Sequence, residues 1–204
     1  MEAASSAIER RLAERVKRLR ARHRLTLDEL ARRSGVSRSM ISLIERAESS
    51  ATTAVLDKLA ASLGVTLASL FATEQQADAA PLIRAADQRA WRDPETGYVR
   101  RNLSPPGFPS ALELAEIVLP AGTRVAYDTG ARLAPFDQQI WVLAGAIAVT
   151  VGDEVHRLGA GDCLAMRLDR PTAFRNEGEE AARYLVALAS ATPPPWPARR
   201  RGAR

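Results

Sequence analysis

The sequence predicts a two-domain α+β protein with a helical first third and an all-β remainder. Apolar residues recur at helical spacing up to about residue 72 and tend to alternate with polar residues further along. Short turn signals separate the later segments at regular intervals. With 204 residues, 46% of them hydrophobic, the chain is long enough for two small packed domains. We expect a head at 1–72, a linker at 73–80, a β-domain at 81–190 and a disordered basic tail at 191–204.

Charge and composition narrow the class of protein. The net charge of +5 divides into +5 for residues 1–72, −4 for 73–190 and +4 for 191–204. A basic head on an acidic body indicates that only the head meets a polyanion. A single cysteine, Cys163, excludes an intramolecular disulfide, and no apolar run approaches the ~18–20 residues of a membrane span. We expect a soluble, cytoplasmic protein in which Cys163 is a buried small hydrophobe.

The stretch from Thr26 to Arg46 is the most informative part of the head. Thr26 and Glu29 have the spacing of a capping box, in which each side chain satisfies the other residue's backbone donor. Gly35 supplies the positive φ that ends this helix, and Ser37 caps the next one. A capped helix, a glycine turn and a second helix within 21 positions indicate a helix-turn-helix, whose second helix enters the DNA major groove.

Three more helices bring the expected number in the head to five. Residues 7–22 form an amphipathic helix, because their apolar side chains recur every three or four positions. The other face of that helix is crowded with basic residues, and we expect most of them to face solvent. A fourth helix runs from about Thr53 to Leu63, and Thr66 caps a short fifth helix.

The combined pattern resembles the phage repressor and Cro type of DNA-binding domain, the XRE family, which has a five-helix lambda-repressor-like fold. The residues concerned are LTLDELARRSGVSRSMISLIERAESS and TTAVLDKLAASLGVTLASLF. The resemblance places Arg38, Ser39 and Ser42 on the groove-facing side, with Arg38 suited to a bidentate contact with guanine. It also pairs Glu45 with Arg20. The positions that it implies near the DNA backbone are Thr26, Leu27, Arg46, Ser49 and Ser50.

Short β-strands are expected beyond residue 98. The expected strands are Tyr98–Leu103, Ala111–Leu119, Gln139–Leu143, Ile147–Val151, Glu154–Leu158, Cys163–Met166, Thr172–Arg175 and Arg183–Ala189. Regular short strands with turns between them predict an all-β sandwich or barrel. The segment WRDPETGYVRR at 91–101 braces either this barrel or a dimer contact, and the sequence does not decide between the two.

The stretch QQIWVLAGAIAVTVGDEVHRLGAGDCLAMRLDRPTAFRN resembles the cupin family, the small jelly-roll barrel. The positions that mark its two motifs are Gly145, Gly161 and Asn176. Metal-binding cupins use a His-x-His pair, a Glu and a later His, and these places fall here on Ala131–Ala134, Gln138 and Thr172. None of these side chains is a good ligand for a divalent first-row metal. The resemblance therefore implies a cupin with no metal, no cofactor and no catalytic residues.

A barrel without metal still offers an interior in which a small molecule can bind. The candidate effector-binding residues are Arg132, Gln138, Ile140, Thr172 and Phe174. In this interpretation Arg132 pairs with a carboxylate, while Gln138 and Thr172 fix the orientation of the ligand. The alternative is that these residues simply fill the barrel core.

Together the two resemblances imply an XRE-family transcription regulator with a C-terminal cupin sensor domain. We expect a repressor that binds a pseudo-palindromic DNA operator as a homodimer, with half-sites about one helical turn apart or a multiple of it. The barrels supply the dimer contact, and an effector shifts the placement of the heads by ~1–3 kcal/mol. Two alternatives stay open: a metal-dependent cupin isomerase or oxygenase with an attached DNA-binding domain, and a regulator whose cupin only dimerises.

Overall fold

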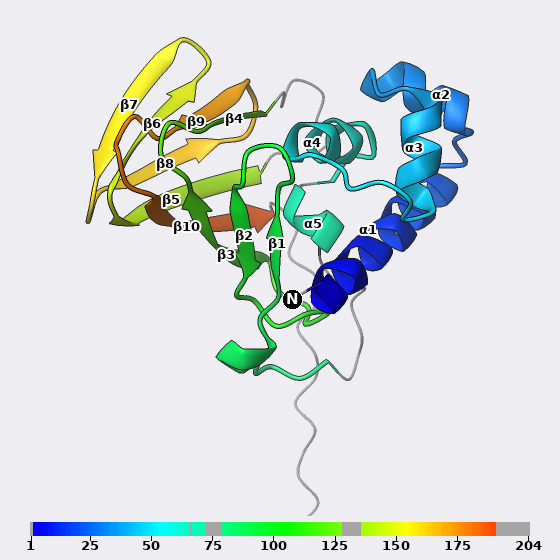
Figure 1. The fold of residues 1–204 in the computed structure, drawn as a ribbon, viewed down its shortest axis with the longest axis horizontal. Helices are drawn as coiled ribbons and strands as arrows, with labels where there is room; N and C mark the ends of the chain where they lie inside the picture. Colours follow the sequence, from blue (N-terminus) through cyan, green and yellow to red (C-terminus); the bar gives the residue numbers. More distant parts are fainter. Residues whose placement is uncertain (1, 66, 72–78, 128–135, 191–204) are drawn as a thin grey trace, which may run out of the picture.

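The computed structural model describes residues 2–65, 67–71, 79–127 and 136–190. The helices gather on one side of the molecule and two β-sheets on the other (Figure 1). The helices are α1 (Glu2–Arg22), α2 (Leu27–Ser34), α3 (Arg38–Glu45), α4 (Thr53–Ser62) and α5 (Leu67–Phe71). The predicted cap at Thr66, most of the linker and the basic tail lie outside the described residues.

The helical head is confirmed, but the number of helices is confirmed only in part. Four helices of eight or more residues are described where five helices were predicted, and the expected fifth is reduced to the five-residue α5. The helices pack on a common core in which Leu30, Ile41, Leu56 and Leu59 are fully buried. Burying one such side chain contributes about 1.5–3 kcal/mol. None of the described helices is long and apolar enough to cross a membrane.

Local signals set the ends of α2 and the start of α3 as predicted. Thr26 Oγ1 accepts a hydrogen bond of 3.2 Å from Glu29 N, and Glu29 Oε2 accepts one of 2.7 Å from Thr26 N. The pKa of Glu29 is lowered by the hydrogen bonds that its carboxylate accepts from Thr26 N and from Thr26 Oγ1. Gly35 has a φ of 66° with open space around its Cβ position, so the backbone conformation is what requires glycine there. Ser37 Oγ accepts from Met40 N at 3.2 Å and begins α3.

The β-domain is a sandwich of two antiparallel sheets. The strands are β1 (Ala90–Arg92), β2 (Val99–Asn102), β3 (Leu112–Leu119), β4 (Arg124–Tyr127), β5 (Phe136–Ala144), β6 (Ala146–Val151), β7 (Glu154–Gly159), β8 (Cys163–Arg167), β9 (Thr172–Arg175) and β10 (Ala182–Ser190). One sheet has the order β1-β2-β3-β10-β5-β8 and the other has the order β4-β9-β6-β7. Eight of these strands correspond to predicted ones, whereas β1 and β4 were not predicted.

The hairpin β1–β2 fastens the head to the β-domain. Asp93, in the turn of this hairpin, is buried, and its Oδ2 accepts a hydrogen bond of 2.7 Å from Thr53 N at the start of α4. Nearby, the rings of Phe71 and Trp91 lie 5.4 Å apart between α5 and β1. Figure 1 shows α5 beside β1 of this hairpin. The 91–101 segment therefore braces the head against the β-domain.

The carboxylate of Asp93 is held by backbone donors. Its Oδ1 accepts from Glu95 N at 2.8 Å and from Thr96 N at 3.1 Å. Burial acts to raise the pKa of Asp93, but the hydrogen bonds from Thr53, Thr96 and Glu95 together lower it below its ordinary value. The contact between the two domains thus depends on a charged carboxylate.

Candidate nucleic-acid interface and cupin interior

The outward face of α3 displays the residues predicted to contact DNA bases. Ile41 and Ile44 are buried against the other helices, so the positions that alternate with them at helical spacing point away from the core. Arg38 and Ser39 are exposed and Ser42 is half-buried. We call Arg38, Ser39, Ser42 and Arg46 the recognition surface. The structure brings these four side chains to one face of the head.

Both arginines of the recognition surface form ion pairs with neighbouring carboxylates. Arg38 Nε lies 3.3 Å from Asp28 Oδ1 of α2, and both side chains are exposed. Arg46 Nη2 donates to Glu48 Oε2 at 2.8 Å, and Arg46 Nη1 donates to Ser42 Oγ. The hydrogen bond from Arg46 lowers the pKa of Glu48. Exposed ion pairs contribute ~0–1 kcal/mol, so a DNA phosphate or base can replace either carboxylate at small cost.

The remaining predicted DNA contacts flank the recognition surface less uniformly. Thr26 is exposed, whereas Leu27 is half-buried and packs against the core of the head. Ser49 Oγ lies 4.0 Å from Met40 Sδ. Ser50 Oγ donates to Glu9 Oε1 of α1. Sequence analysis missed the acidic partners Asp28 and Glu48. Asp28 could have been found from the acidic first turn of α2, because the helix-turn-helix geometry places that turn beside the first turn of α3.

The inward face of α3 is anchored to α1 by the predicted ion pair. Arg20 Nε and Nη2 donate to Glu45 Oε1 and Oε2, each at 2.7 Å. Arg20 Nη1 also donates to Leu25 O at 2.9 Å. The hydrogen bond to Glu45 raises the pKa of Arg20 despite partial burial. This bidentate pair fixes the orientation of α3 relative to the longest helix of the head.

The candidate effector residues of the cupin face the space between the two sheets. Gln138 and Ile140 occupy the buried positions of the alternating pattern of β5, and Thr172 and Phe174 are buried on β9. The Phe174 ring stacks on that of Tyr184 with centroids 5.8 Å apart. Ile140 and Phe174 therefore contribute to the packed interior. Arg132, with the His-x-His place at Ala131–Ala134, lies outside the described residues.

Two motif positions of the cupin resemblance have structural roles. Gly145 has a φ of 74°, and a Cβ there would lie 3.1 Å from Ala182 Cα, so a side chain would be strained by the backbone conformation and crowded by Ala182. Asn176 is buried, and its Nδ2 donates to Leu119 O at 3.0 Å and to Glu180 O at 2.8 Å. Asn176 thus ties the loop before β10 to the end of β3.

Cys163 departs from its predicted environment. The prediction that it is buried is wrong, because Cys163 is exposed. It begins β8, an edge strand that pairs only with β5, with Cys163 opposite Trp141.

The histidine of the β-domain has a carboxylate neighbour. His156 Nε2 of β7 lies 3.6 Å from Glu154 Oε2. Within the described ranges, no three His, Cys, Asp or Glu side chains are grouped as a metal site.

Comparisons with known proteins identify both domains. The family described as Helix-turn-helix (HTH_3) matches residues 16–70, and the family described as Cupin domain (Cupin_2) matches residues 134–188. The HTH-type transcriptional regulator SutR of Escherichia coli (strain K12) is 27% identical over 173 residues, which cover 85% of this chain and 91% of SutR. The crystal structure of an HTH_3 family transcriptional regulator from Vibrio cholerae superposes with a TM-score of 0.69 at 25% identity, covering 91% of this chain and 98% of that one.

This chain is a DNA-binding transcription regulator with a helix-turn-helix domain and a cupin domain. The similarity to the two regulators extends over most of the chain, so it includes the order of the domains as well as the domains themselves. A hydroxypropylphosphonic acid epoxidase from S. wedmorenis also aligns over 89% of this chain and 98% of its own, with a TM-score of 0.44 and 18% identity. That similarity is too low to support a conclusion about chemistry.

Proposed function

We propose that this regulator is a repressor that binds a pseudo-palindromic operator as a homodimer in the cytoplasm. The supporting observation is the recognition surface, which projects from a helix whose other face is fixed by the Arg20–Glu45 pair. In the proposed complex, Arg38, Ser39 and Ser42 contact base edges in the major groove. The residues proposed to contact the DNA backbone are Thr26, Leu27, Arg46, Ser49 and Ser50.

The proposed dimer contact is the outer face of the larger cupin sheet. Trp141 is 50% exposed there and Leu143 is 36% exposed, and both lie on the outward side of β5. Trp141 is flanked by Cys163 of β8 and Leu185 of β10. Large apolar side chains grouped on one face are typical of an interface. A dimer is also expected energetically, because one short recognition helix offers few base contacts.

The cupin domain is proposed to act as a sensor or dimerisation module and not as an enzyme. The support comes from the side chains at Gln138 and Thr172, which stand where metal-binding cupins have Glu and His. In the proposed sensor, an effector binds between the sheets near Gln138, Ile140, Thr172 and Phe174. Stoichiometric iron, manganese or zinc in the purified protein would overturn the non-enzymatic assignment. A flat thermal-shift response to amino acids, polyamines and organic acids would favour a cupin that only dimerises.

Selection of binding sites from random duplex DNA with the full-length chain tests the DNA-binding proposal. We expect two inverted half-sites about 10 base pairs apart, or a multiple of that spacing. Binding to the selected site should weaken steeply as salt rises, because phosphate contacts release counterions. A single asymmetric site, or an affinity that does not depend on salt, would contradict the proposed complex.

Two matched variants test the dimer contact. Trp141→Glu should convert the dimer to a monomer in light scattering and should weaken operator binding, because it places a charge in the proposed interface. Val155→Glu makes the same kind of change at a position that is 53% exposed on the other sheet, and it should leave the dimer intact. Dissociation caused by Val155→Glu and not by Trp141→Glu would place the interface on the smaller sheet.

A further inference from the structure

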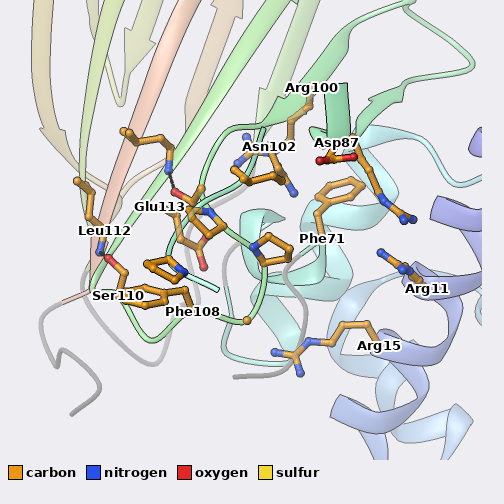
Figure 2. Close-up of a pocket in the computed structure, with 18 of the residues that line it drawn as sticks. Arg11, Arg15, Phe71, Asp87, Arg100, Asn102, Phe108, Ser110, Leu112 and Glu113 are labelled. Atoms are coloured by element: carbon orange, nitrogen blue, oxygen red, sulfur yellow. Dashed lines mark hydrogen bonds between the residues drawn. The ribbon is translucent and has the colours of Figure 1, made fainter. Parts of the chain in front are cut away.

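A cavity of about 670 Å³ lies where the head meets the cupin. Its volume is within the ~300–1,000 Å³ typical of small-molecule sites. Figure 2 shows Arg11 and Arg15 of α1 on one side of it, and Phe108, Ser110 and Glu113 from the segment that leads into β3 on the opposite side. We call this space the junction cavity. Its lining does not include Gln138, Ile140, Thr172 or Phe174 of the cupin interior, and both domains build its walls.

The lining of the junction cavity is strongly basic. Two carboxyl groups, those of Asp87 and Glu113, face five guanidinium groups. The five are those of Arg11, Arg15, Arg22, Arg89 and Arg100. They come from α1, from the segment before β1 and from β2, so the fold gathers positive charge from distant parts of the chain. Such a concentration of one sign in a concave site attracts anions.

One of these arginines is buried with an unsatisfied donor. Arg100 is 6% exposed, and its Nε has no hydrogen-bond partner among the described residues. Leaving a charged donor unpaired away from water is costly, so native proteins usually supply a partner. Arg100 also lines an adjoining cavity of about 40 Å³ together with Arg11 and Phe71. An anion in this region would meet Arg100 and the α1 arginines at the same time.

The cavity also offers apolar surface. Figure 2 shows Phe71 of α5 near Arg11 and Phe108 on the far side, and Pro105 and Leu114 are also among the lining residues. Burial raises the pKa of Glu113, even though Arg100 and Arg15 act to lower it. The lining therefore combines cationic groups, which attract an acidic group, with aromatic rings, which offer apolar surface.

We propose that the junction cavity binds a small organic anion: a molecule with a phosphate or carboxylate group for Arg15 and Arg100 and an apolar body for Phe71 and Phe108. Bidentate contacts from guanidinium groups suit both kinds of acidic group. A molecule of this size would touch α1 and α5 of the head and the β2–β3 segment of the cupin together.

The position of the cavity also gives such a ligand a regulatory role, and this part rests on the proposed function. Arg11 and Arg15 lie on the same helix as Arg20, which holds Glu45 of the recognition helix. An anion bound between α1 and the cupin favours the placement of the head seen in this structure. Its leverage on DNA binding equals the difference in its affinity for this placement and any other.

Calorimetric titration of the full-length protein without DNA tests the binding step. The probes are phenyl phosphate and 4-phenylbutyrate, with inorganic phosphate as the anion alone and benzyl alcohol as the apolar body alone. We expect at least one of the two amphipathic anions to bind more tightly than both control compounds. The proposal is overturned if neither binds more tightly than inorganic phosphate, or if both have a Kd weaker than about 1 mM.

Variants in the walls of the cavity separate this site from general attraction to a basic protein. Arg15→Gln should weaken binding of the better probe about tenfold, the effect of losing one charge-assisted hydrogen bond. Glu113→Gln should strengthen it, because a negative charge is removed. Lys17→Gln removes a positive charge from an exposed position of the same helix that does not line the cavity, and it should leave the Kd unchanged. Equal weakening by Arg15→Gln and Lys17→Gln would overturn the proposal.

Arg100 requires a check on folding, because it is buried. Arg100→Lys keeps the charge but removes the fork of donors, and we expect it to fold and to weaken binding. If circular dichroism shows that it does not fold, the test of the site rests on Arg15→Gln, which should weaken probe binding, and on Glu113→Gln, which should strengthen it. Since all of these titrations omit DNA, loss of the proposed repressor function would leave their outcome unaffected. A probe that binds as expected but does not alter operator affinity would overturn the regulatory role alone.

Discussion

The two faces of α3 carry ion pairs of the same chemistry with different consequences. On the inner face, Arg20 and Glu45 form two hydrogen bonds of 2.7 Å, with side chains that are 17% and 7% exposed. On the outer face, Arg38 and Asp28 approach to 3.3 Å with side chains that are 65% and 71% exposed. A desolvated bidentate pair fixes geometry, whereas an exposed pair contributes ~0–1 kcal/mol and exchanges readily. The inner face of α3 is thus fixed to α1, whereas Arg38 on its outer face can exchange Asp28 for a DNA group at small cost.

The largest expected effect follows from breaking the inner pair. Glu45→Ala leaves the partly buried guanidinium of Arg20 without its carboxylate, which should lower the free energy of unfolding by about 3 kcal/mol in urea titrations. Glu48→Ala breaks the exposed pair with Arg46 and should change it by less than ~1 kcal/mol. Similar losses in the two variants would contradict the distinction between the two faces.

A smaller effect, on binding instead of stability, is expected for the outer face. Arg38→Ala should reduce specific DNA binding by ~1–3 kcal/mol and relax base preference at one position, while the urea midpoint stays the same. Asp28→Ala removes the partner of Arg38 but keeps the guanidinium, so it should preserve specific binding. Fluorescence anisotropy with the selected operator and a scrambled duplex measures both. A loss that is equal for the two duplexes would make Arg38 a phosphate contact.

The smallest effect concerns Asp93, a buried carboxylate held by backbone donors instead of a cation. Because folding lowers its pKa, its contribution to stability is present above the unfolded pKa of about 3.9 and is lost as the pH falls through the folded value. The difference in unfolding free energy between the wild type and Asp93→Asn should therefore shrink below about pH 4. Urea titrations at several pH values measure this difference. A difference that stays constant down to pH 3 would show that the charge of Asp93 does not stabilise the contact.

The head was largely predictable because its signals are local. The Thr26–Glu29 capping box, the turn at Gly35 and the cap at Ser37 each depend on residues within a few positions of one another. The Arg20–Glu45 pair spans 25 positions, and the family resemblance, not the spacing, indicated it. The DNA contacts themselves stay predictions, and the structure adds that Arg38, Ser39 and Arg46 are exposed and Ser42 is half-buried.

The predictions that were wrong or incomplete concern residues whose surroundings depend on segments far away in the sequence. Strands β1 and β4 have three and four residues, too few for an alternating pattern to be recognised. Cys163 was expected to be buried because CLAM is apolar, but an edge strand has neighbours on one side only. The α1 arginines suggested a solvated face. Arg11 and Arg15 line a cavity because the segment before β3, nearly 100 positions away, lies opposite them.

The hydrogen bond from Thr53 to Asp93 also bears on how this regulator can be recombined with other sensors. A graft cut at residue 72 would transfer the head without the acceptor for Thr53 N and without Trp91, the ring that packs on Phe71. The natural cassette for a chimera therefore includes the β1–β2 hairpin through Asn102. A sensor that is exchanged beyond this hairpin leaves the contacts of Thr53 with Asp93 and of Phe71 with Trp91 intact.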